Sequence, residues 1–151
     1  MKNDKSVDVL NSLITINNDR IAGYETAIDE VKDADLKSLF NQFIENSMTY
    51  KSAFVDEVES LGGKPDEEGT RADGKIYRAW MDFKAMVTGK DRKAILSSCE
   101  YGEDVAMNAY ERALKDKDLH DTQISLITSQ YNKLKADHDK VRNLRDATVK
   151  V

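Results

Sequence analysis

Apolar residues recur three and four positions apart along the first part of the chain. This spacing predicts a long helix from Val7 to Val31 with a single packing seam. Asn17 and Tyr24 complete the heptad spacing of that seam. A charged break follows, in which Asp33 or Asp35 is expected to cap a second helix. Its apolar side comprises Leu36, Phe40, Phe43, Ser47, Tyr50, Phe54 and Leu61.

The second helix is expected to end at Leu61, because Gly62 suits the left-handed position after a helix and Pro65 cannot extend one. A shorter amphipathic helix is predicted over residues 76–89, within a long connection. Asp91 then caps a third long helix that reaches about Lys115. The fourth helix carries Ile124, Ile127, Leu134, Val141 and Leu144.

The lengths of the connections predict how these helices are arranged. Short connections make helices one and two, and helices three and four, antiparallel neighbours. The long connection between helices two and three lets those two run parallel. We therefore predict an all-α, ferritin-like up-down-down-up four-helix bundle forming one domain over residues 1–151, with a short extra helix in the crossover. The alternative order is up-down-up-down.

Composition narrows the class of function. The chain has 151 residues, 34% of them charged, and a net charge of −5 without an uninterrupted basic face, so a nucleic-acid partner is not expected. It lacks an apolar run of the roughly 20 residues that a membrane span needs and a signal-peptide pattern, so we expect no membrane partner and a cytoplasmic location. The single cysteine, Cys99, falls on an apolar helix side and is expected to be a buried, inert thiol.

Acidic residues inside a core-forming helix are the main candidate for chemistry. On a helical wheel Glu103 falls among the apolar residues of the third helix, and Glu100 lies at their border. Counting about 1.5 Å per residue from the turn at Asp33 places Glu25, Glu100 and His138 in one layer, with Glu103 about a turn deeper. Carboxylates with an imidazole suit a transition metal, so Glu100, Glu103, Glu25 and His138 are the predicted ligands, for Fe, Mn or Zn.

Other interpretations of these residues remain open. Glu100 and Glu103 could instead pair with Arg142 or Arg145, and His138 could be a hydrogen-bonded core histidine. A carboxylate-bridged two-metal site would need Glu-x-x-His on two helices. Here Met48 stands where the histidine after Glu45 should be, so at most one metal position is expected. No catalytic residue and no small-molecule substrate can be assigned. Trp80 and its apolar neighbours on the crossover helix predict a homodimer contact.

Four blocks of sequence resemble the bacterial DUF2383 family. They are residues 10–25 with Asn17-Asn18-Asp19-Arg20, residues 61–65, residues 74–84 around Trp80, and residues 95–104 with Tyr110. The resemblance implies a ferritin-like bundle with a crossover between its second and third helices. It also implies, by analogy, a function related to those of iron or oxidative-stress proteins.

Two functions of different classes follow from these patterns. The first is a bundle that binds a transition metal through core carboxylates and a histidine. The second is a noncatalytic structural or stress-associated protein in which the same residues form an ion-paired polar core.

Overall fold

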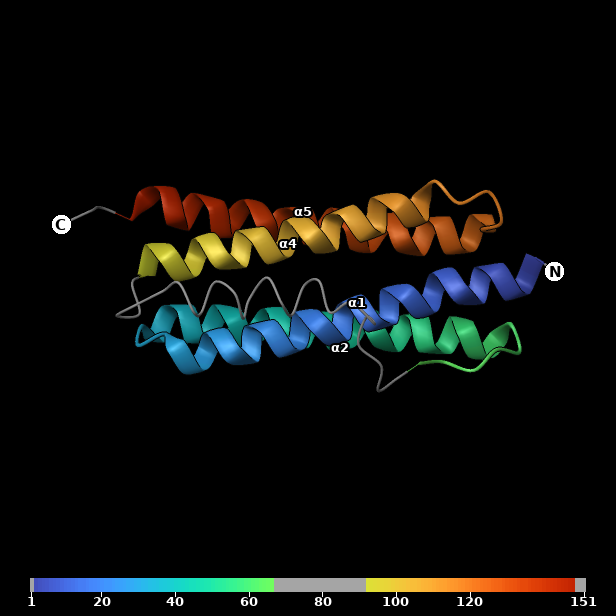
Figure 1. The fold of residues 1–151 in the computed structure, drawn as a ribbon, viewed down its shortest axis with the longest axis horizontal. Helices are drawn as coiled ribbons and strands as arrows, with labels where there is room; N and C mark the ends of the chain where they lie inside the picture. Colours follow the sequence, from blue (N-terminus) through green and yellow to red (C-terminus); the bar gives the residue numbers. More distant parts are fainter. Residues whose placement is uncertain (1, 67–91, 149–151) are drawn as a thin grey trace.

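The computed structural model describes residues 2–66 and 92–148, and all regular structure within them is helical. The helices are α1 (Lys2–Glu30), α2 (Ala34–Ser60), α4 (Arg92–Leu114) and α5 (Asp121–Ala147). In Figure 1, α1 and α5 run in one direction along the long axis and α2 and α4 run in the other. The bundle is therefore all-α with up-down-down-up order, as predicted. The predicted crossover helix, its Asp91 cap and Trp80 lie outside the described residues.

The helix ends follow local chemistry. Asp33 is the residue before α2, but its side chain makes no capping hydrogen bond and instead accepts one from Arg92 Nη1 at 2.6 Å, at the start of α4. Gly62 has φ of +79° just after α2, as its sequence position predicts. Gly63 N–H then bonds to Val58 O, which closes the turn. These contacts set the two ends of α2.

The core is one cluster of apolar side chains drawn from all four helices. It includes Leu10, Leu13, Phe40, Phe43, Phe54, Leu96, Cys99, Ile127, Leu134 and Val141. Helix α1 packs against α2 and α4, α5 packs against α4, and α2 and α5 make the smallest of the contacts between neighbouring helices. Cys99 is fully buried, as predicted. None of the helices in the described ranges is long and apolar enough to cross a bilayer.

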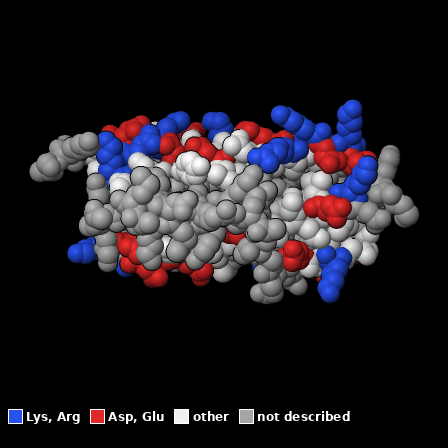
Figure 2. Space-filling model, viewed as in Figure 1, with Lys and Arg blue, Asp and Glu red and all other residues white. Residues whose placement is uncertain are grey.

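The charged residues lie around this core. Figure 2 shows acidic and basic side chains intermingled along both edges of the face in view. Glu45 and Glu25 are exposed, whereas Glu103 on α4 is fully buried. The bundle thus encloses a charged group, and a buried charge is costly unless the fold compensates it.

Candidate functional site

Arg20 of α1 is the centre of the buried polar core. Its side chain is 0% exposed, and its five N–H donors all reach acceptors from three other helices. Nε and Nη2 donate to the two oxygens of Glu103 at 2.5 and 2.9 Å. Nη1 donates to Ser47 Oγ at 2.7 Å and to Phe43 O at 3.2 Å, and Nη2 also donates to Asp137 at 3.1 Å. The guanidinium is fully hydrogen-bonded.

Aromatic rings and a second carboxylate complete the surroundings of Arg20. Its guanidinium carbon lies 5.3 Å from the ring centre of Tyr24 and 5.4 Å from that of Phe43, within range of a cation–π contact. Burial alone would lower the pKa of Arg20, but the charge and hydrogen bonds of Glu103 hold it above its ordinary value. Arg20 is therefore a fixed cation in the interior.

Asp137 of α5 connects this centre to the surface. Its side chain is 16% exposed and lines a hollow of about 310 Å³ between α2 and α5. Burial raises the pKa of Asp137, while the neighbouring Arg20 opposes that rise. Glu103 and Asp137 together supply two carboxyl groups for one guanidinium. Asp137 is the member of this pair that can exchange a proton with solvent.

A second polar layer surrounds Tyr110 of α4. Its hydroxyl accepts from Asn17 Nδ2 at 2.8 Å and donates to Gln130 Oε1 at 2.7 Å, and Gln130 Nε2 donates to Tyr50 O at 3.3 Å. This chain of hydrogen bonds links all four helices. Burial raises the pKa of Tyr110, although the hydrogen bond from Asn17 acts to lower it. Burial also raises the pKa of Tyr50, to about 12. Both phenols are thus held in the neutral form.

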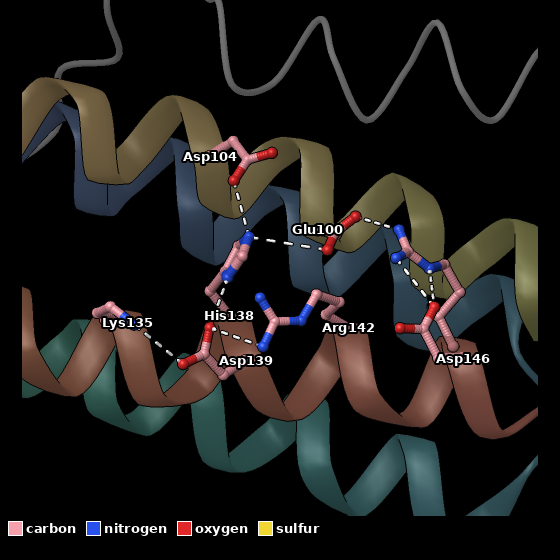
Figure 3. Close-up of polar contacts among 8 residues, drawn as sticks. Glu100, Asp104, Lys135, His138, Asp139, Arg142 and Asp146 are labelled. Carbon is pink, nitrogen blue, oxygen red and sulfur yellow. Dashed lines mark hydrogen bonds and ion pairs between the residues drawn. The ribbon is translucent and has the colours of Figure 1, made fainter.

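A third polar cluster lies at the seam between α4 and α5 (Figure 3). His138 points from α5 towards α4, with Nε2 2.8 Å from Asp104 Oδ1 and 3.8 Å from Glu100 Oε2. Its Nδ1 lies 3.1 Å from Asp139 Oδ1. Glu100 Oε1 accepts a hydrogen bond from Arg145 Nη1. Among the described residues, no hydrogen bond or ion pair joins this cluster to Arg20.

Comparison with known proteins supports the resemblance seen in the sequence. A family model described as a domain of unknown function, DUF2383, matches residues 5–116. The chain belongs to this family. A comparison with curated proteins found no match to this chain.

Among solved structures, this DUF2383 protein is similar to a mutant of Mycobacterium smegmatis Dps1. The TM-score is 0.80 and the identity 18%, over 95% of this chain and 97% of that one. At this identity the similarity shows the shared ferritin-like four-helix fold and nothing finer.

The structure separates the four predicted metal ligands. Glu103 is buried as predicted, but its cation is Arg20 and not Arg142 or Arg145 as the ion-pair interpretation supposed. Glu100 does bind Arg145 and approaches His138. Glu25 is exposed on α1. Within residues 2–66 and 92–148, no group of three or more His, Cys, Asp or Glu side chains converges into a ready-made metal site.

Sequence reasoning missed Arg20, Asp137 and Asp104 as members of these clusters. A signal for Arg20 exists, because it lies three residues after Asn17 and four before Tyr24, both of which were placed on the packing seam. An arginine at such a position is normally expected to reach solvent with its charged end. Its burial becomes favourable only beside Glu103, which lies far away in the sequence.

The core does not fit the two-metal centre of ferritin-like carboxylate proteins. Both oxygens of Glu103 already accept hydrogen bonds from Arg20. Glu45 is exposed, and Met48, at the position where a histidine ligand would be needed, is 53% exposed. The interior positions that such a centre requires are thus occupied by an arginine or directed outward.

Proposed function

We propose that this DUF2383 protein is a noncatalytic ferritin-like bundle protein, with a structural or stress-associated role, in which Arg20 balances the charge of the core carboxylates. The supporting observation is that all five N–H donors of the buried Arg20 are bonded, two of them to Glu103. An internal cation of this kind takes the electrostatic place that a metal occupies in other ferritin-like bundles.

The energetics of buried charge support this proposal. A metal ion bound by Glu103 would have to displace the guanidinium from both carboxylate oxygens. The displaced Arg20 would then be a fully buried cation without its main partner, a situation that costs about 3–5 kcal/mol. The pair of Arg20 and Glu103 therefore disfavours metal binding at the centre of the bundle.

Transition-metal binding is the second candidate function, with an iron- or stress-related role by analogy with ferritin-like proteins. The distance of 3.8 Å between Glu100 and His138 favours it. In this form of the proposal the metal, Fe, Mn or Zn, lies at the seam between α4 and α5. Glu103 and Glu25 then take no part in its binding.

Self-association also stays a proposal. The predicted homodimer contact involves Trp80, which lies outside the described residues. Sedimentation at tens of micromolar protein tests it, and a monomer under those conditions would remove the dimer. The proposed location is the cytoplasm, for which the single, buried Cys99 is suited.

Elemental analysis of the untagged protein, purified without chelators, tests whether the core around Arg20 and Glu103 is free of metal. We expect the content of Fe, Mn and Zn to be the same in the wild type and in Glu103→Gln. Far-ultraviolet circular dichroism checks that the variant remains helical. A stoichiometric metal that is present in the wild type and lost in a helical Glu103→Gln variant would overturn the proposal.

A further inference from the structure

His138 has carboxylate oxygens on both sides of its ring (Figure 3). Nε2 is 2.8 Å from Asp104 Oδ1, and Nδ1 is 3.1 Å from Asp139 Oδ1. A neutral imidazole has one N–H donor and one acceptor lone pair. One of these two contacts would therefore set a lone pair against a carboxylate, unless a second proton or a metal cation lies between them.

The contacts of the neighbouring side chains favour Nε2 as the position of the cation. Asp139 can accept a hydrogen bond from Nδ1–H, which is how histidine ligands are commonly oriented by an outer carboxylate. Nε2 then faces two carboxylates on successive turns of α4, those of Glu100 and Asp104. The Asp104 side chain is 56% exposed, so an ion can enter from solvent.

A single ion would need small side-chain shifts, because no three His, Cys, Asp or Glu side chains of the described residues converge into a metal site as they stand. Two ligand atoms that each lie about 2.0–2.2 Å from one tetrahedral metal are roughly 3.3–3.6 Å apart. Nε2 and Asp104 Oδ1, at 2.8 Å, therefore have to separate by about 0.5–0.8 Å to admit the ion. Glu100 Oε2 is 3.8 Å from Nε2, so it has to move inward by less than about 1 Å. Arg145 holds the other oxygen, Oε1, and leaves Oε2 directed towards His138.

We propose that His138 Nε2, Asp104 and Glu100 bind a divalent first-row transition metal at the seam between α4 and α5. This inference rests on the second candidate function above and adds Asp104 as a ligand. One imidazole and two carboxylates form a nitrogen and oxygen ligand set, for which Zn²⁺ binds more tightly than Mn²⁺ or Fe²⁺.

Calorimetric titration of chelator-stripped, untagged full-length protein with Zn²⁺ tests the site. We expect one ion per chain and a rise in the melting temperature, because the ion joins α4 to α5. His138→Asn and Asp104→Asn should each weaken binding at least about tenfold. The matched control is His120→Asn, since His120 is the other of the two histidines and is exposed at the start of α5. It should bind Zn²⁺ like the wild type.

Two outcomes would overturn the site. One is no Zn²⁺ binding by the wild type, which would leave His138 as a hydrogen-bond partner of Asp104 and Asp139. The other is binding of unchanged affinity in His138→Asn. Neither outcome affects the metal-free core, which is tested separately by Glu103→Gln. Metal binding that is lost in Glu103→Gln but kept in His138→Asn would refute both proposals, the metal-free core around Arg20 and the metal site at the seam between α4 and α5.

Discussion

The pair of Arg20 and Glu103 can be tested by a double-mutant cycle. Arg20→Met leaves a fully buried carboxylate without its main partner, and Glu103→Leu leaves a fully buried guanidinium with only Asp137 as a charged partner. Removing one member of a buried pair costs about 3–5 kcal/mol. We therefore expect each single variant to lose several kcal/mol of unfolding free energy.

The double variant should lose much less unfolding free energy than the two single variants lose together. Methionine and leucine fill similar volumes without charge, and such replacements of whole buried ion pairs are often close to neutral. Asp137 can take up a proton, since its pKa is already raised and its side chain reaches solvent. The sum of the single losses is about 6–10 kcal/mol, so the expected coupling between the two substitutions is at least about 3 kcal/mol.

Urea unfolding followed by circular dichroism measures these differences. For a chain of this size about 3–5 kcal/mol corresponds to a fall in the melting temperature of roughly 6–20 °C. The matched control is Arg92→Met, because Arg92 also pairs with two aspartates but its side chain is 29% exposed and those of Asp33 and Asp35 are 40% and 63% exposed. That change should cost no more than about 1 kcal/mol.

Additivity in the cycle would refute this reasoning. If the loss in the double variant equals the sum of the single losses to within about 0.5 kcal/mol, Arg20 and Glu103 are not energetically coupled. A loss of unfolding free energy in Arg92→Met as large as that in Arg20→Met would likewise show that burial does not decide how much an arginine's ion pairs stabilise the protein.

Two further expectations concern the α1–α2 end of the bundle and the tyrosines. A Cβ at Gly63 would lie 2.6 Å from Val7 Cγ2, so Gly63→Ala should destabilise the protein by about 1–3 kcal/mol in thermal melts. Adding Val7→Ala should recover part of this loss of stability. An unchanged melting temperature in Gly63→Ala would contradict the close contact. Folding raises the pKa of Tyr50 to about 12, so from about pH 10 upward the unfolded chain releases a proton that the folded protein keeps, and stability should fall as pH rises. Urea midpoints between about pH 9 and 11, with phenolate absorbance recorded in parallel, measure this, and a flat profile would count against it.

Much of the fold could be predicted because its signals are local. The end of α2 depends on Gly62 and on Pro65, both read directly from the sequence. The inward position of Glu103 follows from its place on the helical wheel of α4, and the structure confirms it. A rise of about 1.5 Å per residue also predicts that Glu100 and His138 share a layer, and in the structure Glu100 Oε2 lies 3.8 Å from His138 Nε2.

The charge partners could not be predicted in the same way. Arg20 lies 83 residues before Glu103 and 117 before Asp137. Its position beside the packing seam does not by itself decide whether the charged end is buried or reaches water. Glu25 was assigned to the same layer as Glu100, yet its direction around α1 leaves it exposed. Height along a helix follows from counting residues, but rotation about the axis depends on how the helices pack.

The sequence by itself therefore determined the four helices and the burial of Glu103, because backbone geometry and hydrophobic periodicity act over a few residues. It favoured the up-down-down-up order through the lengths of the connections, and the tertiary structure decided between that order and the alternative. Only the tertiary structure decided that Arg20 neutralises Glu103 and that His138 faces Asp104, because the cost of a buried charge depends on partners that folding brings together from distant parts of the chain.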